Sequence, residues 1–443
     1  MKTNKFNFQN IFYFYAHSYL KSWKLFLLKL INKPEILFLF FGIIFGVIFL
    51  ISATPYSQPD EKGNTQRAID IANGIFYNKG CYHTRSDIDQ IFSKSKLGNY
   101  LRSTGRKQNT KNGYSPVMYL QSGLGIKTGY LLFKNAVAMF YLARLFNLFV
   151  WLALIYFAIR VTPILKWQFC IFALLPKSIY VGMSVLCDSF VTAFSFLFFA
   201  YMFKLIFESK EKLSNIQISG YAILTFISAF LKGCLIYPAF LMLLVKDKRK
   251  IIISTLVITV CGLLGSIWIA ANCIAYRDGV NPELNKYILF TKPHYFFRSV
   301  FLNTHWIIKM LDTMFINHGM YVKGASALSV IIYLLNFLYV PSEKEIRPSH
   351  RLMCMSIFFI YFITSSLFLY LNWTHCEIFT TAIPYHGRYF LPFLPCLFLI
   401  FTANPNNKDN VKFKIFIVCF ILCHLIAASY YLLMRGFNIF YYL

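Results

Sequence analysis

The sequence has few acidic residues and few charged residues of any kind. Its 443 residues include 17 aspartates and glutamates against 44 lysines and arginines, a formal net charge of +27, and charged residues make up only 14%. Soluble domains carry about 25% charged residues, so this composition excludes an ordinary soluble protein. Hydrophobic residues reach 58%, aromatic residues 19% and mean hydropathy +0.55. These values predict an all-α integral membrane protein.

The basic residues do not gather on one face. They are scattered among apolar runs, whereas a nucleic-acid-binding protein concentrates them in a patch or stripe. We therefore expect no nucleic acid partner. Membrane lipids with anionic headgroups, or an anionic lipid-linked substrate, fit the charge better.

Metal-binding cysteine motifs are also missing. The eleven cysteines form no CxxC pair, and most lie within apolar runs, where cysteine behaves as a small hydrophobic residue. Cys81 and Cys376 fall in polar loops, and a disulfide between them is an open alternative. Four histidines expected on the outer face match no zinc motif: His294, His305, His318 and His375. We expect no site made of several metal-binding side chains, and the sequence identifies no cofactor. Binding of a divalent cation by carboxylates is an open alternative.

The N-terminus predicts a retained anchor rather than a cleaved signal peptide. Residues 1–34 contain six lysines and no carboxylate, so we expect them to be a cytoplasmic basic segment. Residues 35–403 are expected to form the transmembrane catalytic region, and residues 404–443 the last span and a periplasmic C-terminus. Eleven spans are predicted, at about 36–53, 138–160, 167–186, 189–207, 216–231, 233–245, 251–275, 324–340, 352–371, 389–403 and 413–435.

The region 216–245 has two possible topologies. A single span would put the cluster "KDKRK" (246–250) outside, whereas a short helical hairpin puts it inside with the other basic loops. We favour the hairpin because cytoplasmic loops carry an excess of lysine and arginine. The polar loops 54–135 and 276–323 then share the outer face. Within the first loop, residues 115–133 are apolar but contain three glycines and Lys127, which predicts a helix lying at the membrane surface.

Two adjacent carboxylates, Asp60 and Glu61, follow the first span directly. The simpler interpretation is that Asp60 caps the next helix. Alternatively, a carboxylate at the membrane surface deprotonates an acceptor hydroxyl as it attacks an activated sugar. Asp188, in a turn between two apolar spans, also has two interpretations: a helix cap, or a second acidic group in the same cavity that tunes the base or holds a cation.

Three basic side chains are candidates for binding a phosphate. Lys232 lies between two short apolar helices, where it either extends to the interface or offers its ammonium to a lipid-linked phosphate. His386 and Arg388 stand at the outer mouth of the tenth span in "PYHGRYFLP". Arginine suits bidentate phosphate binding, although an interfacial anchor is the alternative for this segment.

Several stretches occur in the same order as in a bacterial family of multi-spanning proteins. They are "ATPYSQPDEKGNTQRAIDIANG", "YLARLFNLFVWLALIYFAIR", "FALLPKSIYVGMSVLCDSFVTAFSFLFF", Lys232 with Pro238, "LYLNWT" and "GRYFLPFLP". Over about residues 50–402 the chain resembles the GT-C class of glycosyltransferases, which take sugars from polyprenyl-phosphate donors. In size and spacing it is similar to the prophage-type, serotype-converting O-antigen glucosyltransferases of Gram-negative bacteria.

The resemblance implies a GT-C-like fold in the bacterial inner membrane, with the active site facing the periplasm. It implies that Asp60 is catalytic with Glu61 beside it, and that Arg388 binds the donor phosphate. Where the family often has a histidine shortly after "PDE", this chain has Asn64 or a neighbour. The implied reaction is inverting transfer of a sugar, with glucose expected, from a polyprenyl-phosphate donor to a periplasmic glycan such as lipopolysaccharide O-antigen.

Supporting roles fall to three further residues in this scheme: Asp188, Arg67 and Tyr389. Two other functions remain open. A transporter or flippase for lipid-linked sugars should carry ionisable groups deep within its spans and show internal repeats, whereas this chain gathers its polar groups toward one face. An O-antigen polymerase is a further alternative that the sequence separates poorly from a transferase of single sugars.

Overall fold

The computed structural model describes residues 32–76, 87–95, 114–209, 211–272, 279–301, 325–375, 383, 385–405 and 410–440. Cys81, Cys376, His305 and His318 lie outside these residues, so the predicted disulfide stays a prediction. The described parts are helical, with no strand among them. In chain order the elements are α2 (Pro34–Ser52), α3 (Glu61–Ala72), α4 (Asp87–Lys94), η1 (Pro116–Tyr119), α6 (Leu120–Phe133), α7 (Ala136–Val161), α8 (Lys166–Ala173), α9 (Pro176–Met183), α10 (Cys187–Glu208), α11 (Asn215–Leu231), η2 (Gly233–Leu244), α12 (Lys250–Asn272), α13 (Pro282–Thr291), α14 (Pro293–Phe301), α16 (Ala325–Tyr339), α17 (Pro348–Trp373), η3 (Gly387–Tyr389), η4 (Leu391–Phe393), α18 (Leu394–Phe401) and α19 (Val411–Phe440).

Long apolar helices dominate the bundle. Six helices in the described part of the chain are long and apolar enough to cross a membrane: α2, α7, α10, α12, α17 and α19. Shorter apolar helices occur at Asn215–Leu231, Gly233–Leu244, Leu328–Tyr339 and Gly387–Phe401. The prediction of an all-α membrane protein is therefore confirmed, while the count of eleven spans stays a prediction.

One predicted span is not a continuous helix. The run 167–186 contains two short helices, α8 and α9, separated at Leu174 and Leu175. Pro176 explains the break, because proline has no N–H to donate and forces the residue before it out of the helical region. Leu175 accordingly has the extended dihedrals φ −54° and ψ 137°. Both short helices are almost wholly buried.

Residues 216–245 form the predicted hairpin. α11 begins with a capping box made by Ser214 and Gln217, and η2 returns toward the same end. The backbone N–H of Leu213, before α11, donates to the carboxylate of Asp247, after η2, at 2.8 Å. The two ends of the hairpin therefore meet, and the cluster 246–250 lies beside the start of α11.

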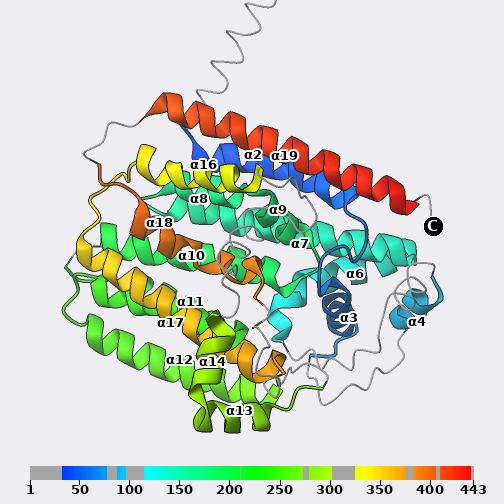
Figure 1. The fold of residues 1–443 in the computed structure, drawn as a ribbon, viewed down its shortest axis with the longest axis horizontal. Coiled ribbons are helices and arrows are strands. Elements are labelled where there is room, and N and C mark those ends of the chain that lie inside the picture. The colour runs from blue at the N-terminus through cyan, green and yellow to red at the C-terminus, as the bar shows by residue number, and fades with distance from the viewer. Residues whose placement is uncertain are drawn as a thin grey trace, which may run out of the picture.

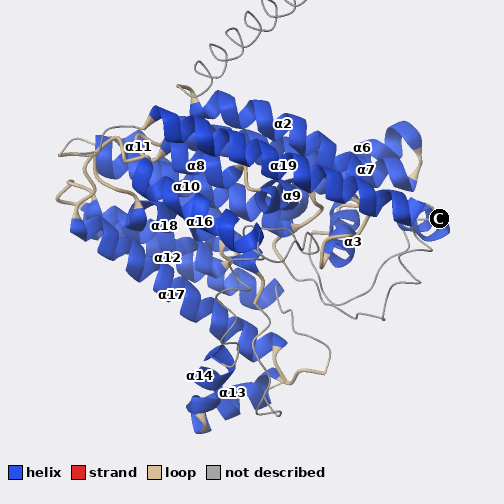
Figure 2. Cartoon of the chain, turned by 45° about the horizontal axis from the view of Figure 1, so that its top comes forward, coloured by secondary structure: helices blue, strands red, loops and turns tan. Residues whose placement is uncertain are grey.

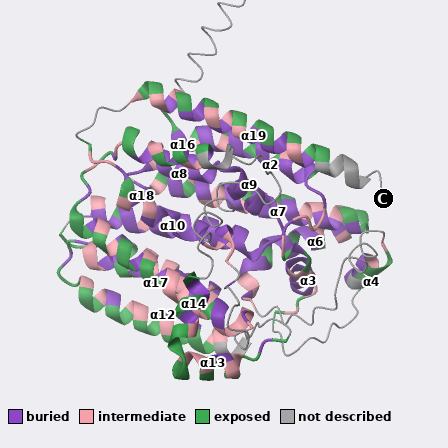
Figure 3. Cartoon of the chain, in the orientation of Figure 1, coloured by how far each residue is buried: buried purple, intermediate pink, exposed green. Residues whose placement is uncertain are grey.

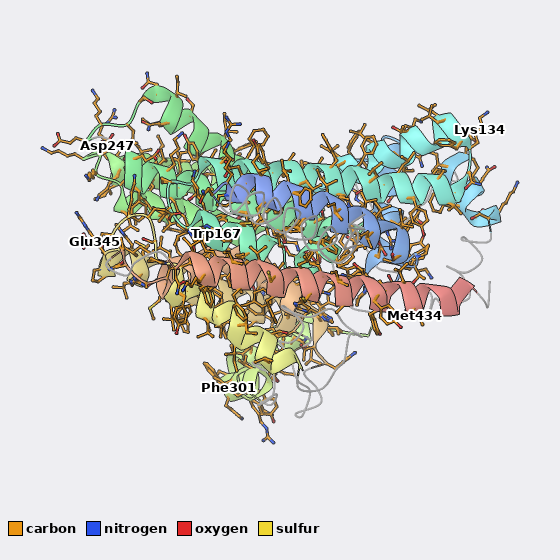
Figure 4. The ribbon with its side chains drawn as sticks, turned by 90° about the horizontal axis from the view of Figure 1, so that it is seen from above. Lys134, Trp167, Asp247, Phe301, Glu345 and Met434 are labelled. Atoms are coloured by element: carbon orange, nitrogen blue, oxygen red, sulfur yellow. The ribbon has the colours of Figure 1, made fainter. Side chains whose placement is uncertain are left out.

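The basic loops gather at one end of the bundle. Lys344 Nζ donates to the carbonyl of Phe207 at 3.2 Å, and Arg351 donates to the carbonyl of Thr402 at 2.8 Å. Figure 4 shows Asp247 and Glu345 together at this end, with Lys134 and Met434 at the opposite one. This segregation is what the hairpin topology predicts, and we refer to the two ends as the basic end and the opposite end.

The core consists of α7 to α10 with α2 and α19 packed along them (Figures 1 and 3). Trp151 of α7 is fully buried and meets the ring of Phe38 of α2, with centroids 5.5 Å apart. α10 is buried for most of its length. The outer helices α12 and α17 expose many large apolar side chains, as expected of surfaces that face lipid.

Glycines let α6 approach α7 closely. A Cβ atom added to Gly125 would lie 2.5 Å from the carbonyl oxygen of Leu142, and one added to Gly129 would lie 2.6 Å from the Cα of Met139. Both neighbours are backbone atoms, which can move aside only at a large cost in energy. The glycines in 115–133 therefore mark a helix–helix contact of the small-residue type found in membrane bundles.

We expect Gly125→Ala to destabilise the protein by about 1–3 kcal/mol, because the added methyl overpacks the α6–α7 contact. Thermal unfolding of the purified protein in detergent measures this. Gly262→Ala on α12 is the matched control, because its Cβ would sit 3.6 Å from a flexible Ile236 side chain, and alanine favours helices over glycine. Equal stability of the two variants would contradict the proposed role of the glycine.

Candidate functional site

Four charged side chains from four distant segments converge at the ends of α10 and α11 that point away from the basic end. Asp60 pairs with Arg388, Arg388 lies against Asp188, and Asp188 pairs with Lys232. We call these residues the charged cluster. Sequence analysis predicted all four as site residues, and the structure brings them together, although 328 residues separate Asp60 from Arg388.

Asp60 stands in a rare backbone conformation at the start of α3. It occupies the N-cap position with φ 70° and ψ −4°, a left-handed geometry, and its side chain makes no capping hydrogen bond. Aspartate tolerates this region better than most residues. The carboxylate turns instead toward Arg388 and keeps 55% of its side chain exposed. The capping interpretation of Asp60 is thus wrong, and its carboxylate stands at the opening of the cluster.

Asp188 is not a helix cap either. It lies in the first turn of α10, one residue inside the helix, and Leu186 occupies the N-cap position. Its two carboxylate oxygens face two cations, with Lys232 Nζ 2.7 Å from one and Arg388 Nε 3.2 Å from the other. The carboxylate therefore holds the two basic groups on either side of it.

Lys232 occupies the unwound corner between α11 and η2. Its backbone is extended, with φ −143° and ψ 127°, which aims the side chain at Asp188. The ammonium also lies over the ring of Tyr114, 5.3 Å from its centroid, a cation–π contact. Burial raises the pKa of the Tyr114 hydroxyl, partly offset by Lys232, so the phenol stays neutral. Lys232 thus binds within the cluster rather than extending away from it.

Arg388 connects the cluster to the first loop. Its guanidinium donates to the carbonyl of Pro59 at 2.8 Å and to the carboxylate of Asp60. The side chain is only 4% exposed, and η3, a short helix before α18, carries it. Arginine supplies donors in a planar fork, which here joins the segments of Asp60 and Asp188.

Lys177 is a third cation near the cluster, and sequence analysis missed it. It is the second residue of α9 and is buried, with Nζ 3.4 Å from Oε1 of Gln58. Arg388 and Asp188 are both close enough to act on its charge. A buried lysine is uncommon unless it is paired, so the lysine in "FALLPKSIY" was a signal that could have identified it.

Glu61 lies in a separate, fully buried ion pair. Arg144 of α7 donates to both of its carboxylate oxygens, at 3.0 and 2.8 Å, and the backbone N–H of Val185 donates a third hydrogen bond. Arg144 also donates to the carbonyls of Ala53 and Thr54. Neither charged side chain is exposed. The structure therefore separates Glu61 from Asp60 and gives it the geometry of a brace between α3, α7 and the turn before α10.

Arg144 carried a signal in the sequence. It is the single charged residue in the apolar stretch 136–159, and an ionisable residue within a span usually has a partner or a function. The partner could not be chosen from sequence, because several acidic residues lie in the outer loops.

The other predicted site residues lie around the cluster or away from it. Arg67 donates to the carbonyls of Ile75 and Phe76, just beyond the end of its own helix, at 3.1 and 2.8 Å, which is a local structural role. Tyr389 lies beside Arg388, whose guanidinium carbon is 5.4 Å from the ring centroid. His386 packs edge-on against Tyr389 at 5.5 Å. Tyr389 and His386 therefore border the cluster, and Arg67 does not.

Asn64, three residues after the "PDE" sequence, has a structural role. Its side-chain oxygen accepts hydrogen bonds from the Tyr119 hydroxyl at 2.6 Å and from the N–H of Cys187 at 3.2 Å. Its amide group donates to the carbonyl of Asp60 at 2.7 Å. These bonds fix the start of α3 to the start of α10, and with it the separation of Asp60 and Asp188.

Metal ligands are not grouped in the described residues. No set of three His, Cys, Asp or Glu side chains there could hold a metal ion. The space between the carboxylates of Asp60 and Asp188 is occupied by the guanidinium of Arg388. The cluster is therefore built around cations of the protein itself.

Fold and cluster together define a helical membrane protein in which the four side chains of the charged cluster meet away from the basic end. The chain belongs to the family described as "Predicted membrane protein (DUF2142)", whose family model matches residues 80–397. No curated protein and no solved structure matches the chain. The matched segment includes Asp188, Lys232 and Arg388, whereas Asp60 precedes it.

Proposed function

We propose that the protein is a membrane glycosyltransferase of the bacterial inner membrane. It transfers a sugar, with glucose the first to test, from a polyprenyl-phosphate donor to a periplasmic glycan acceptor such as lipopolysaccharide O-antigen. The observation that supports this proposal is the convergence of Asp60, Asp188, Lys232 and Arg388 at the end away from the basic loops. That end is expected to face the periplasm.

In the proposed reaction, Asp60 acts as the general base. The acceptor hydroxyl attacks the anomeric carbon of the donor, the carbon–oxygen bond to the phosphate breaks, and the bonding electrons leave with the phosphate oxygen. Asp60 takes the hydroxyl proton. A single displacement of this kind inverts the anomeric centre. The exposed position of the Asp60 carboxylate supports this role, because a sugar hydroxyl arriving from water can reach it.

The basic side chains of the site would bind the phosphate more strongly as the reaction proceeds. A sugar phosphodiester carries one negative charge, and the departing polyprenyl phosphate gains a second when the bond to the sugar breaks. Lys232, Arg388 and Lys177 would stabilise this developing charge in a site where water is scarce. Lys232 and Arg388 match the carboxylates of Asp60 and Asp188 in charge, and the charge of an arriving phosphate would favour the protonated form of Lys177 beside them.

Donor binding would also release the base. In the structure the Asp60 carboxylate contacts Arg388. A donor phosphate competes for the same guanidinium, since arginine binds phosphate and carboxylate with the same fork. Its arrival would leave Asp60 free to accept the proton from the acceptor, so the donor should bind before the acceptor.

Arg388→Ala is expected to impair use of the donor more than use of the acceptor. Loss of a preorganised charge donor costs about 10²–10³-fold in rate, and we expect the donor KM to rise while the acceptor KM changes little. Initial rates with each substrate varied in turn measure the two effects. Arg388→Lys keeps the charge without the planar fork, so its rate and donor KM should lie between those of the unsubstituted protein and those of Arg388→Ala. An equal loss toward both substrates would indicate that Arg388 is structural.

A further inference from the structure

The helices α13 and α14 form an exposed pair that the proposed reaction does not use. They project from the side of the bundle next to the end of α17 (Figures 1 and 2). In α13, Tyr287 and Phe290 are 66% and 77% exposed, and in α14 Phe297 and Phe301 are 55% and 61% exposed. Phe301 points away from the bundle in Figure 4. So many exposed aromatic rings on two short helices require a partner surface.

The opposite faces of the pair are anchored firmly. The side-chain amide of Asn285 donates to the carbonyls of Tyr370, Leu371 and Thr374, at 3.2, 2.9 and 2.8 Å, which satisfies the C-terminal end of α17. Phe296 packs against Tyr370 with ring centroids 5.3 Å apart. The pair is thus a fixed part of the fold.

The anchor point places the pair at a particular depth. α17 begins at Pro348, near the basic end, and its 26 residues extend about 39 Å at 1.5 Å per residue. The hydrocarbon core of a bilayer is about 30 Å thick. The end of α17, where Asn285 binds, therefore lies at the boundary between hydrocarbon and headgroups. α13 and α14 pack against α17 at this boundary.

The charges of the pair fit the same surface. Lys286, Lys292 and Arg298 are exposed, against one carboxylate, Glu283. Basic residues interleaved with exposed aromatic rings are typical of helices that lie in the membrane interface. The basic groups reach anionic headgroups while the rings enter the acyl boundary.

We propose that α13 and α14 form a membrane-surface platform that binds the outer leaflet of the bilayer, with its aromatic side chains in the lipid and its basic side chains on anionic headgroups. The platform also contacts the segment before Arg388, because the N–H of Ile383 donates to the carbonyl of Ser299 at 3.4 Å. It therefore connects the lipid surface to the region that carries the charged cluster.

Photo-crosslinking of the full chain tests this platform without reference to activity. p-Benzoylphenylalanine replaces Phe290 or Phe297 in protein reconstituted in nanodiscs of phosphatidylethanolamine and phosphatidylglycerol, and intact mass spectrometry detects lipid adducts. We expect adducts at both positions, at yields within about twofold of those at Leu263, an exposed residue of the spanning helix α12. The probe at Asp87, whose exposed neighbours on α4 are the polar residues Gln90, Ser93 and Lys94, should give no adduct.

Two outcomes would overturn the platform. Absence of lipid adducts at 290 and 297, as at Asp87, would show that the rings face water. A crosslink to a second copy or to another protein in membranes would show that the occupant is a protein. The variant K286Q/K292Q/R298Q addresses the headgroups: we expect the phosphatidylglycerol share of the adducts to fall to the share in the bilayer, and an unchanged share would refute binding of anionic headgroups.

Discussion

Replacing Asp60 with asparagine is expected to lower the rate of sugar transfer by about 10²–10⁴-fold, the usual contribution of a general base. Asparagine has nearly the same shape and tolerates the left-handed backbone that Asp60 adopts, so α3 should still begin at this residue. Its amide can accept a hydrogen bond from Arg388 but cannot take a proton. Initial rates of transfer with purified protein measure the effect.

The control for Asp60→Asn is the same change at Asp87. This residue is exposed at the start of α4, outside the charged cluster, and Asp87→Asn should leave the rate unchanged. Both variants should reach the membrane and unfold at the temperature of the unsubstituted protein. An Asp60→Asn variant that transfers sugar at the normal rate would remove Asp60 from the role of base.

Arg144→Met is expected to destabilise the protein by about 3–5 kcal/mol, because it leaves the carboxylate of Glu61 buried without its partner. Neither side chain of this pair is exposed, and Arg144 holds four hydrogen bonds. The expected result is lower yield and a lower unfolding temperature. Unfolding in detergent, followed by tryptophan fluorescence or thiol exposure, measures the change.

A second substitution tests whether the buried charge is the cause. Glu61→Gln in the Arg144→Met background removes the uncompensated carboxylate, so the double variant should recover part of the lost stability. Equal stability of the single and double variants would place the loss in the hydrogen bonds to Ala53 and Thr54 instead. A cost below about 1 kcal/mol for Arg144→Met, the usual value for exposed pairs, would contradict a structural role for the pair.

The spans were largely predictable from sequence, because few backbone structures can cross a bilayer. Backbone groups must be satisfied internally in lipid, so apolar runs of sufficient length become helices, as α2, α10, α17 and α19 do. The hairpin at 215–244 was predictable because charge bias in the loops constrains topology. The break at Pro176 was visible as a proline within an apolar run, and its local effect outweighed the hydropathy.

The residues of the site were predictable from sequence, but their ion-pair partners were not. Asp60, Asp188, Lys232 and Arg388 stood out because ionisable residues near apolar spans are rare and costly. Which acid would face which base depended on three-dimensional packing. Adjacent in sequence, Asp60 and Glu61 point into different environments because α3 begins between them, so one reaches Arg388 and the other reaches Arg144. Lys177 was not predicted as a site residue, because its burial results from tertiary packing that the sequence does not show.

The central claim is that the charged cluster transfers a sugar from a lipid-linked phosphate. Its most direct test is to incubate the purified protein with polyprenyl-phosphate glucose and lipopolysaccharide, with and without a chelator, and to measure the mass of the glycan. The proposal predicts a gain of one hexose per acceptor that requires Asp60. No gain with the unsubstituted protein, under conditions in which it binds the donor, would contradict it.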